Sequence, residues 1–157
     1  MRPSLEQAIA AHSKSVFAAA YSLLKNREDV EDVVQDTFLR YYTGGKQFSS
    51  EEHLRAWLLQ VAVNRAKDLL KSASRQRSVP LELEPGIEAF PSDESRELFR
   101  AVTALPEAYR IVIHLHYYED YPVREIARVL RLPQATVKTR LFRGRELLKK
   151  ALKEESP

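Results

Sequence analysis

The sequence predicts an all-α protein: two small helical domains joined by a flexible linker, with a helix-turn-helix in the C-terminal domain. Apolar residues recur at helical spacing along most of the 157 residues, and the alternating pattern of strands is nearly absent. Residues 76–93 interrupt that spacing with three Pro and one Gly, as a linker does. Residues 123–148 contain two amphipathic segments separated by a short turn, which is the pattern of a helix-turn-helix.

These observations place the two domains at residues 1–75 and 94–157. Fully extended, the linker of 18 residues between them spans at most about 60–65 Å. The expected helices are residues 4–24, 27–42, 51–74, 94–104, 107–119, 123–131 and 133–152.

The helix expected at 27–42 has two distinct faces. Asn26 is placed to cap it, and Glu28 and Asp29 lie in the first turn, where carboxylates complement the helix dipole. On periodicity alone, the polar face is an ordinary solvated surface. The apolar face consists of Val30, Val33, Val34, Thr37, Phe38 and Tyr41. The polar face consists of Glu28, Asp32, Gln35, Asp36 and Arg40.

The helix expected at 51–74 follows Ser49, which has capping-box spacing to Glu52. Its apolar side consists of Leu54, Trp57, Leu58, Val61 and Leu69. Another face carries Asn64, Lys67 and Lys71 at spacing i, i+3, i+7. These are either solvated side chains or a site where an amide reads an unstacked base, cations hold the strand and Phe48 offers an aromatic edge. The residues alone leave both interpretations open.

The last helix, expected at 133–152, has a narrow apolar stripe opposite a basic face. The stripe consists of Val137, Leu141, Gly144 and Leu148. The outward face consists of Thr139, Phe142, Arg143 and Glu146, flanked by Lys138, Arg140 and Arg145. An aromatic ring among cations suits a helix in the major groove, where cations meet phosphates and guanines and an apolar edge meets a thymine methyl. A helical hairpin with a merely basic surface is the alternative.

The preceding helix has the pattern of a supporting helix, although its two ends are unusual. Its apolar residues are Val123, Ile126, Ala127 and Leu130. Arg131 stands where a glycine is common, and a left-handed Arg costs about 1 kcal/mol. Pro122 stands where a capping Ser or Thr is expected.

Charge is distributed unevenly along the chain. Residues 123–153 contain ten Lys or Arg against two Glu, and residues 65–77 contain five against one Asp. Residues 26–36 carry five acids and one Arg, and residues 78–95 carry five acids and no base. Two basic segments separated by an acidic one indicate two contacts with DNA and a separate surface for a protein partner.

Several classes of function find no support in the sequence. There is no cysteine, no phosphate-binding glycine loop and no nucleophile elbow, and the only glycines are residues 44, 45, 86 and 144. His114 and His116 are two residues apart, hence on different sides of a helix. We therefore expect no enzyme, no metal site, no cofactor and no small-molecule substrate. No apolar run reaches the length of a membrane span and the N-terminus has no signal-peptide core, so the expected location is the cytoplasm.

Several runs, taken together, resemble the bacterial RNA polymerase sigma factors of the extracytoplasmic-function class along essentially the whole chain. The runs are DVEDVVQDTFLRYY from residue 29, Phe48 with Trp57-Leu58 and NRAKD from residue 64, LPEAYRIV from residue 105, and EIARVLRLPQATVKTRLFRGRE from residue 125. Gly144 departs from the resemblance, because such sequences usually carry Ala there. A glycine within a helix costs about 1 kcal/mol.

The resemblance implies roles for the N-terminal domain as sigma region 2. Asp32, Gln35 and Asp36 would contact the clamp coiled coil of the polymerase β′ subunit. The loop that begins at Phe48, together with Asn64, would help to melt the −10 element and hold an extruded base, with Lys67 and Lys71 along the strand.

The resemblance also implies that the C-terminal domain is sigma region 4, which reads the −35 element of promoter DNA. Lys138, Thr139, Phe142 and Arg143 match the base-reading positions, and Arg140 and Arg145 would contact phosphates. The implied partners are core RNA polymerase, through the β′ clamp and the β flap, and an anti-sigma factor, often membrane-anchored.

Two other functions remain as alternatives at this stage. A stand-alone helix-turn-helix regulator would bind an operator tightly without polymerase. A helical adaptor that binds only protein would not need its basic side chains.

Overall fold

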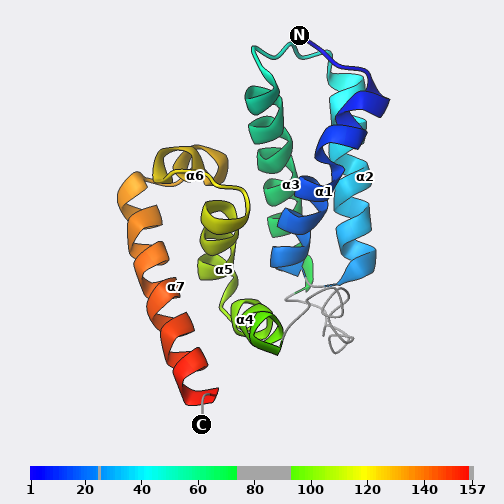
Figure 1. The fold of residues 1–157 in the computed structure, drawn as a ribbon. Helices are drawn as coiled ribbons and strands as arrows, with labels where there is room; N and C mark the ends of the chain where they lie inside the picture. Colours follow the sequence, from blue (N-terminus) through cyan, green and yellow to red (C-terminus); the bar gives the residue numbers. More distant parts are fainter. Residues whose placement is uncertain (25, 74–92, 156–157) are drawn as a thin grey trace. The chain divides into compact units, whose positions relative to one another are not determined.

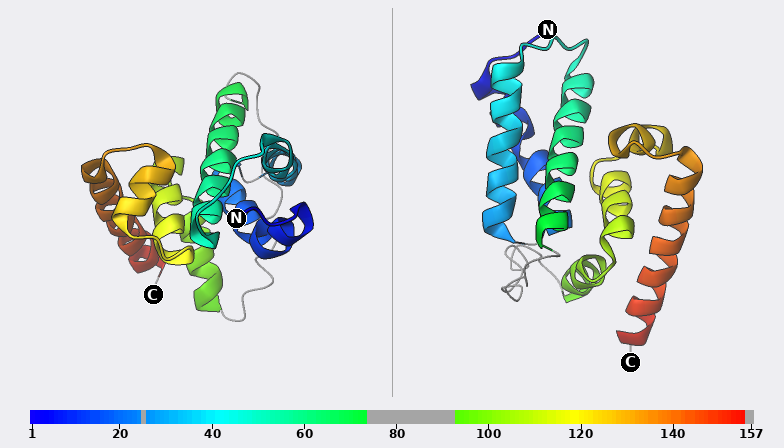
Figure 2. Two further views of the ribbon diagram at one scale, coloured as in Figure 1. Left: turned by 90° about the horizontal axis from the view of Figure 1, so that it is seen from above. Right: turned by 180° about the vertical axis from the view of Figure 1, so that it is seen from behind.

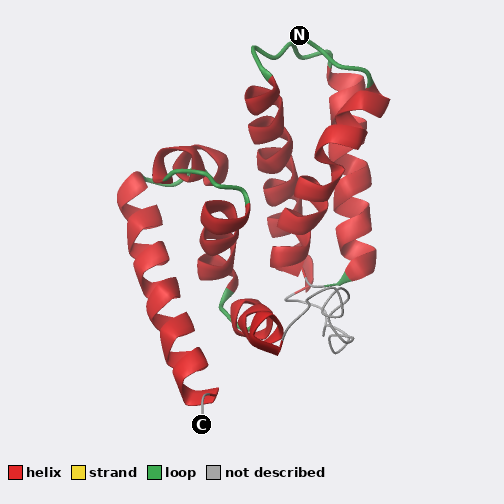
Figure 3. Cartoon of the chain, viewed as in Figure 1, coloured by secondary structure: helices red, strands yellow, loops and turns green. Residues whose placement is uncertain are grey.

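The computed structural model describes residues 1–24, 26–73 and 93–155, and all regular structure within them is helical. The chain divides into two compact units, Met1–Leu81 and Glu82–Pro157, which are described separately below. The prediction of an all-α fold with two helical domains and a helix-turn-helix is confirmed (Figures 1 and 3). Most of the expected linker, residues 76–92, lies outside the described residues. No helix among those described is long and apolar enough to cross a membrane.

Unit 1 is a bundle of three helices, α1 (Leu5–Leu24), α2 (Arg27–Gly44) and α3 (Glu51–Ala73). Each helix contacts both others, and they lie side by side in both views of Figure 2. On α2 the expected apolar face is buried apart from Val34, which is half-buried. On α3, Leu54 and Leu58 are buried as expected, whereas Trp57, Val61 and Leu69 are only half-buried. Because α3 packs on two helices, its buried face also includes Leu59, Ala62, Val63 and Ala66.

The ends of α2 and α3 are fixed by local hydrogen bonds. The predicted cap of α2 is confirmed: the Asn26 side chain accepts from the backbone N–H groups of Glu28 and Asp29, at 3.0 and 3.4 Å. Gly45, with φ of 71°, ends the helix in the left-handed conformation that glycine adopts most readily. The predicted cap of α3 was one residue early, since Ser50 rather than Ser49 accepts from the His53 N–H, at 3.1 Å.

Unit 2 consists of α4 (Asp93–Thr103), α5 (Glu107–Ile113), a π-helical turn η2 (His114–Tyr118), α6 (Val123–Leu130) and α7 (Gln134–Glu155). Helix α7 packs along α5, and α6 lies across one end of the pair, against α7 and the π-helical turn (Figures 1 and 2). The single α-helix expected at 107–119 was wrong in its second half. There the Glu119 N–H bonds to the His114 carbonyl, five residues back, and the wider turn keeps Leu115 in the core.

The helix-turn-helix has the expected core and the expected unusual ends. Ile126 and Leu130 of α6 are buried, as are Val137 and Leu141 of α7. Arg131 ends α6 with φ of 57° and ψ of 48°, which is the left-handed conformation anticipated from the sequence. At the other end Pro122 provides no side-chain cap.

The structure gives a reason for glycine at residue 144, where similar sequences usually carry Ala. Gly144 is buried where α7 passes α5, and a Cβ atom built on it would lie 3.1 Å from Cγ1 of Ile113. That distance is tighter than nine in ten real contacts of this kind. The glycine therefore allows a close approach of the two helices, which offsets its unfavourable helix propensity.

The left-handed Arg131 gives a prediction for stability. Replacing it by Gly removes the Cβ strain at φ of 57°, so Arg131→Gly should stabilise unit 2 by up to about 1 kcal/mol. Arg128→Gly makes the same replacement inside α6 and should instead destabilise by up to about 1 kcal/mol. Thermal unfolding followed by circular dichroism measures both variants. A lower midpoint for Arg131→Gly than for the unmodified chain would contradict the assigned strain.

His114 gives a prediction for pH. Burial lowers its pKa from 6.5 to about 4, and its ring stacks on Tyr118 with centroids 4.8 Å apart. As the pH falls, the unfolded chain protonates His114 before the folded chain does, so the full contribution of neutral His114 to the unfolding free energy is present above pH 6.5. It falls as the pH drops toward 4, by roughly 3 kcal/mol in total.

The corresponding measurement is the unfolding free energy of the full chain at several pH values between 7 and 4. His114→Phe keeps a ring for Tyr118 and removes the titrating group, so its stability should depend less on pH over that interval. An equal loss of stability in both proteins would show that other groups cause it.

Candidate functional site

The outward face of α7 does not pack against the core of unit 2. Phe142 is 63% exposed, an unusual fraction for an aromatic ring on a folded helix. Val137 and Leu141, on the opposite side, are buried against the rest of the unit. Lys138, Thr139, Arg143 and Glu146 are also exposed, and Arg140 and Arg145 are half-buried. Of the six residues expected to contact the −35 element, the four expected at its bases thus lie on the exposed side of α7. Arg140 and Arg145, expected at phosphates, lie on its half-buried flanks.

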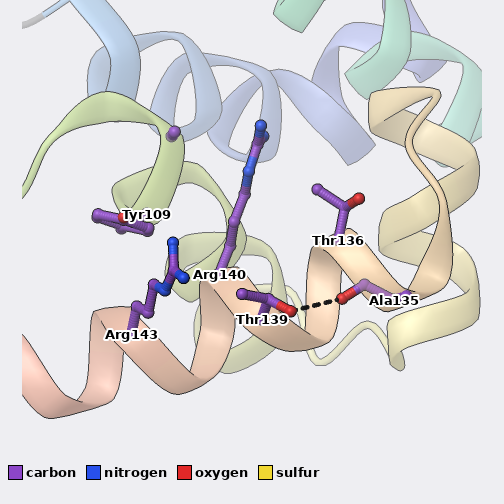
Figure 4. A pocket seen from close by; sticks show the side chains of 7 residues that line it. Tyr109, Ala135, Thr136, Thr139, Arg140 and Arg143 are labelled. Atoms are coloured by element: carbon purple, nitrogen blue, oxygen red, sulfur yellow. Dashed lines mark hydrogen bonds between the residues drawn. The ribbon is translucent and has the colours of Figure 1, made fainter.

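A groove of about 480 Å³ runs between the start of α7 and α5. Figure 4 shows Arg140 and Arg143 extending from α7 toward the same side, with Tyr109 of α5 nearby. The Thr139 hydroxyl donates to the Ala135 carbonyl at 3.0 Å, so its proton is already engaged. The lining is Ala108, Tyr109, Ala135, Thr136, Thr139, Arg140 and Arg143. Two guanidinium groups beside an aromatic wall suit a polyanionic ligand.

Arg145 has a partner that sequence reasoning missed. Its Nε donates to the Tyr117 hydroxyl at 2.6 Å, and its guanidinium lies 5.5 Å from the centre of the Tyr117 ring. Tyr117 is exposed and belongs to the π-helical turn. If residues 107–119 formed one α-helix, as the sequence predicted, Tyr117 would point in a different direction. The sequence contains no other signal of a contact between Tyr117 and α7.

The acidic face of α2 lies on the surface of unit 1. Asp32 and Gln35 are exposed, and Asp36 is half-buried. The Asp36 carboxylate lies 3.7 Å from Arg40 Nε and 3.4 Å from Arg65 Nε of α3. The three residues expected to contact a protein partner therefore share one face, with Asp36 already paired.

Two exposed apolar residues of α2 were not singled out from the sequence. Leu39 is 58% exposed and Tyr42 is 63% exposed. Leu39 follows Asp32 by seven residues and Gln35 by four, so it lies on the acidic face. Single exposed apolar residues are common on protein surfaces, and Leu39 adds one apolar side chain to the acidic face.

On α3, Asn64 and Lys67 are half-buried and Lys71 is exposed. The half-burial of the Asn64 amide favours a shaped polar site at this point of the helix. These three residues share one side of the helix, as their spacing predicts.

The Phe48 ring, expected to offer an aromatic edge to the −10 strand, is buried in this structure. Phe48 is only 2% exposed, and its ring packs edge-on against Trp57 and His53, with centroid distances of 5.5 and 5.1 Å. An aromatic side chain following a helix is compatible with either a surface or a core position, and the residues alone left its role open. Phe48 instead anchors the loop between α2 and α3 in the core.

Comparisons with known proteins identify both units. The family model for sigma-70 region 2 matches residues 8–76, and the model for sigma-70 region 4 matches residues 95–148. The ECF RNA polymerase sigma-E factor of Escherichia coli K12 is 32% identical over 76% of this chain and 72% of its own. The sigma-E factor of Haemophilus influenzae is 30% identical over 78% of this chain and 74% of its own. The ECF sigma factor SigW of Bacillus subtilis is 28% identical, over 91% and 86%.

Two solved structures share the fold. CnrH in complex with the cytosolic domain of CnrY has a TM-score of 0.69 and 28% identity, over 97% of this chain and 89% of its own. The sigma factor RpoE of Bartonella quintana, in complex with the anti-sigma factor NepR, has a TM-score of 0.75. The RpoE chain is 22% identical and is matched over 98% of its length and 96% of this chain, which is a likeness of fold.

Proposed function

We propose residue roles for a chain that belongs to the ECF family of RNA polymerase sigma factors. As a sigma factor, it binds core RNA polymerase and directs promoter-specific initiation of transcription through the −10 and −35 elements. In this proposal residues 94–157 read the −35 element, and residues 1–75 dock on the polymerase and open the −10 element.

The single observation that carries the proposal is the outward face of α7. Its packing side is buried at Val137 and Leu141, so the helix has one free face to place in a major groove. Arg143 and Lys138 are suited to guanine edges, and the exposed Phe142 ring to a thymine methyl. Thr139 completes the base-reading set, while Arg140 and Arg145 contact phosphates.

The acidic face of α2 is proposed as the docking surface for the β′ clamp coiled coil. Asp32, Gln35 and Asp36 supply charge and hydrogen bonds at its rim, and Leu39 adds an apolar contact among them. A protein interface commonly combines a polar rim with buried apolar anchors. A contact between unit 2 and the β flap belongs to the same proposal, without residues assigned to it.

For the −10 element, the proposal assigns base capture to Asn64 and strand contacts to Lys67 and Lys71. A half-buried amide can hydrogen-bond the edge of an extruded base, and the lysines attract the backbone. Extruding a base costs a few kcal/mol, which a preformed polar site can offset. The loop of residues 45–50 contributes its backbone and serines rather than the Phe48 ring.

We further propose that an anti-sigma factor, of the kind that is often membrane-anchored, covers these surfaces when the chain is inactive. The relatives CnrH and RpoE were solved with bound protein partners, which supports this partner class. We infer that the chain acts in the cytoplasm and catalyses no reaction itself. A stand-alone regulator is disfavoured, because such a protein would need no sigma-70 region 2, and this chain matches both region 2 and region 4.

Reconstitution with core polymerase tests the proposal as a whole. Run-off transcription over a promoter library should yield discrete start sites only when both components are present. Asp32→Lys and Gln35→Ala should each weaken binding to core polymerase, since they reverse or remove contacts at the docking surface. Glu6→Lys, an exposed acid on α1, is the matched charge control and should bind normally. Specific initiation with an unimpaired Asp32→Lys variant would refute the docking surface.

Base reading by α7 gives a second prediction. Lys138→Ala and Arg143→Ala should each weaken binding of the holoenzyme to a −35 duplex by about 1–3 kcal/mol and relax sequence preference. Arg140→Ala should weaken binding to all sequences equally and reduce the salt slope by about one. Lys149→Ala, farther along α7, serves as the control for lost charge. Fluorescence anisotropy at several salt concentrations separates these outcomes, and equal effects of Arg143→Ala and Lys149→Ala would argue against base reading.

A further inference from the structure

The start of the chain is bound to the loop of residues 45–50, which joins α2 to α3. The Phe48 N–H donates to the Met1 carbonyl at 2.9 Å, and the Met1 nitrogen donates to the Phe48 carbonyl at 2.6 Å. Residues 47 positions apart are thus paired in both directions. This pairing brings Arg2 to the point where α2 ends.

Arg2 joins three backbone carbonyls with one guanidinium group. Its NH2 atom donates to the carbonyls of Tyr41 and Tyr42, at 2.7 and 3.1 Å, and its NH1 atom donates to that of Lys46, at 2.9 Å. The first two carbonyls belong to the last turn of α2, where helix carbonyls have few partners within the helix and accept from groups outside it. The third belongs to the loop itself. Arg2 therefore ties the loop to the end of the helix.

The ring of Tyr41 completes this arrangement. The Arg2 guanidinium lies 4.9 Å from the centre of the Tyr41 ring, and the Tyr41 hydroxyl donates to the Pro3 carbonyl. Tyr41 is buried and also stacks on Phe48, with ring centroids 6.0 Å apart. The segment of residues 1–3, the end of α2 and the base of the loop thus form one connected cluster.

We propose that Arg2 is a positioning residue for promoter opening, because it fixes the loop of residues 45–50 that faces the melted strand. This inference rests on the proposed role of the loop at the −10 element. Arg2 acts through the loop and need not contact DNA. A loop held in one conformation loses less entropy when it captures a strand. Removing the Arg2 contacts that hold the loop therefore lowers the apparent affinity for the strand.

The first experiment measures the loop without DNA. In the full chain, hydrogen exchange at the Phe48 amide should become about tenfold faster or more in Arg2→Ala, since hydrogen bonds to a charged group are lost. Tyr41→Phe releases the Pro3 carbonyl without changing charge and should speed exchange in the same direction. Arg27→Ala removes an exposed arginine from the same unit and should leave the rate unchanged. Unchanged exchange in both Arg2→Ala and Tyr41→Phe would overturn the inference.

The second experiment measures strand capture by holoenzyme. The probe is a random-sequence pool of fork-junction DNA whose non-template strand is single-stranded. Arg2→Ala should bind it about fivefold more weakly, with unchanged affinity for core polymerase. Arg2→Lys keeps the charge but lacks the fork that spans three carbonyls, so it should recover less than half of the loss. Full recovery by Lys, or an equal loss in Arg27→Ala, would show a simple charge effect and overturn the positioning role.

The same probe distinguishes this inference from the proposed −10 site. If Asn64→Ala weakens binding and Arg2→Ala does not, the site stands and the role of Arg2 is refuted. If faster Phe48 exchange in Arg2→Ala accompanies unchanged binding by both variants, the loop is anchored as described but the −10 site is wrong. Far-ultraviolet circular dichroism, which reports helix content rather than the loop, confirms that the chain remains folded in each variant.

Discussion

The close packing of α7 on α5 is the constraint on which unit 2 depends. A helix can offer a full face to DNA only if a narrow stripe suffices to hold it on the domain. Here that stripe is made of Val137, Leu141 and Gly144, and the glycine lets α7 approach Ile113 to a distance that a Cβ atom would make strained. Because the stripe is narrow, most of the circumference remains free for basic and aromatic side chains. The position of the reading residues is therefore a consequence of packing on the opposite side.

In unit 1, helix α2 likewise has one face buried in the core and another exposed to solvent. Helix α2 buries Val30, Val33 and Tyr41 while keeping Asp32 and Leu39 outside, so the same helix builds the core and presents the proposed docking surface. Its C-terminal end is held by Arg2, which also holds the loop leading to α3. The proposed docking surface and the proposed strand-capturing loop are thus both attached to α2. In this proposal, attachment of α2 to the polymerase places both of them relative to the promoter.

Apart from the end of α5, periodicity and capping chemistry predicted the ends of the described helices to within about three residues, together with the Asn26 cap and the left-handed Arg131. These features are local, since they depend on residues a few positions apart. The structure departs from the expectations where contacts between residues far apart in the sequence determine the conformation. The π-helical turn at His114, the burial of Phe48 and the Tyr117–Arg145 contact each depend on packing between elements that the sequence does not order in space. The anchoring of the loop by Met1 and Arg2, which lie more than 40 residues away from it, has no sequence signal at all.

The central claim is that two separate surfaces of one chain select two separate promoter elements. The direct measurement is run-off transcription from a pool randomised at both elements, with sequencing of the productive templates for Arg143→Ala and Asn64→Ala holoenzymes. The account predicts that Arg143→Ala relaxes the preference at the −35 element alone, and that Asn64→Ala relaxes it at the −10 element alone. Changes at the same element in both variants, or unchanged preferences in both, would contradict it.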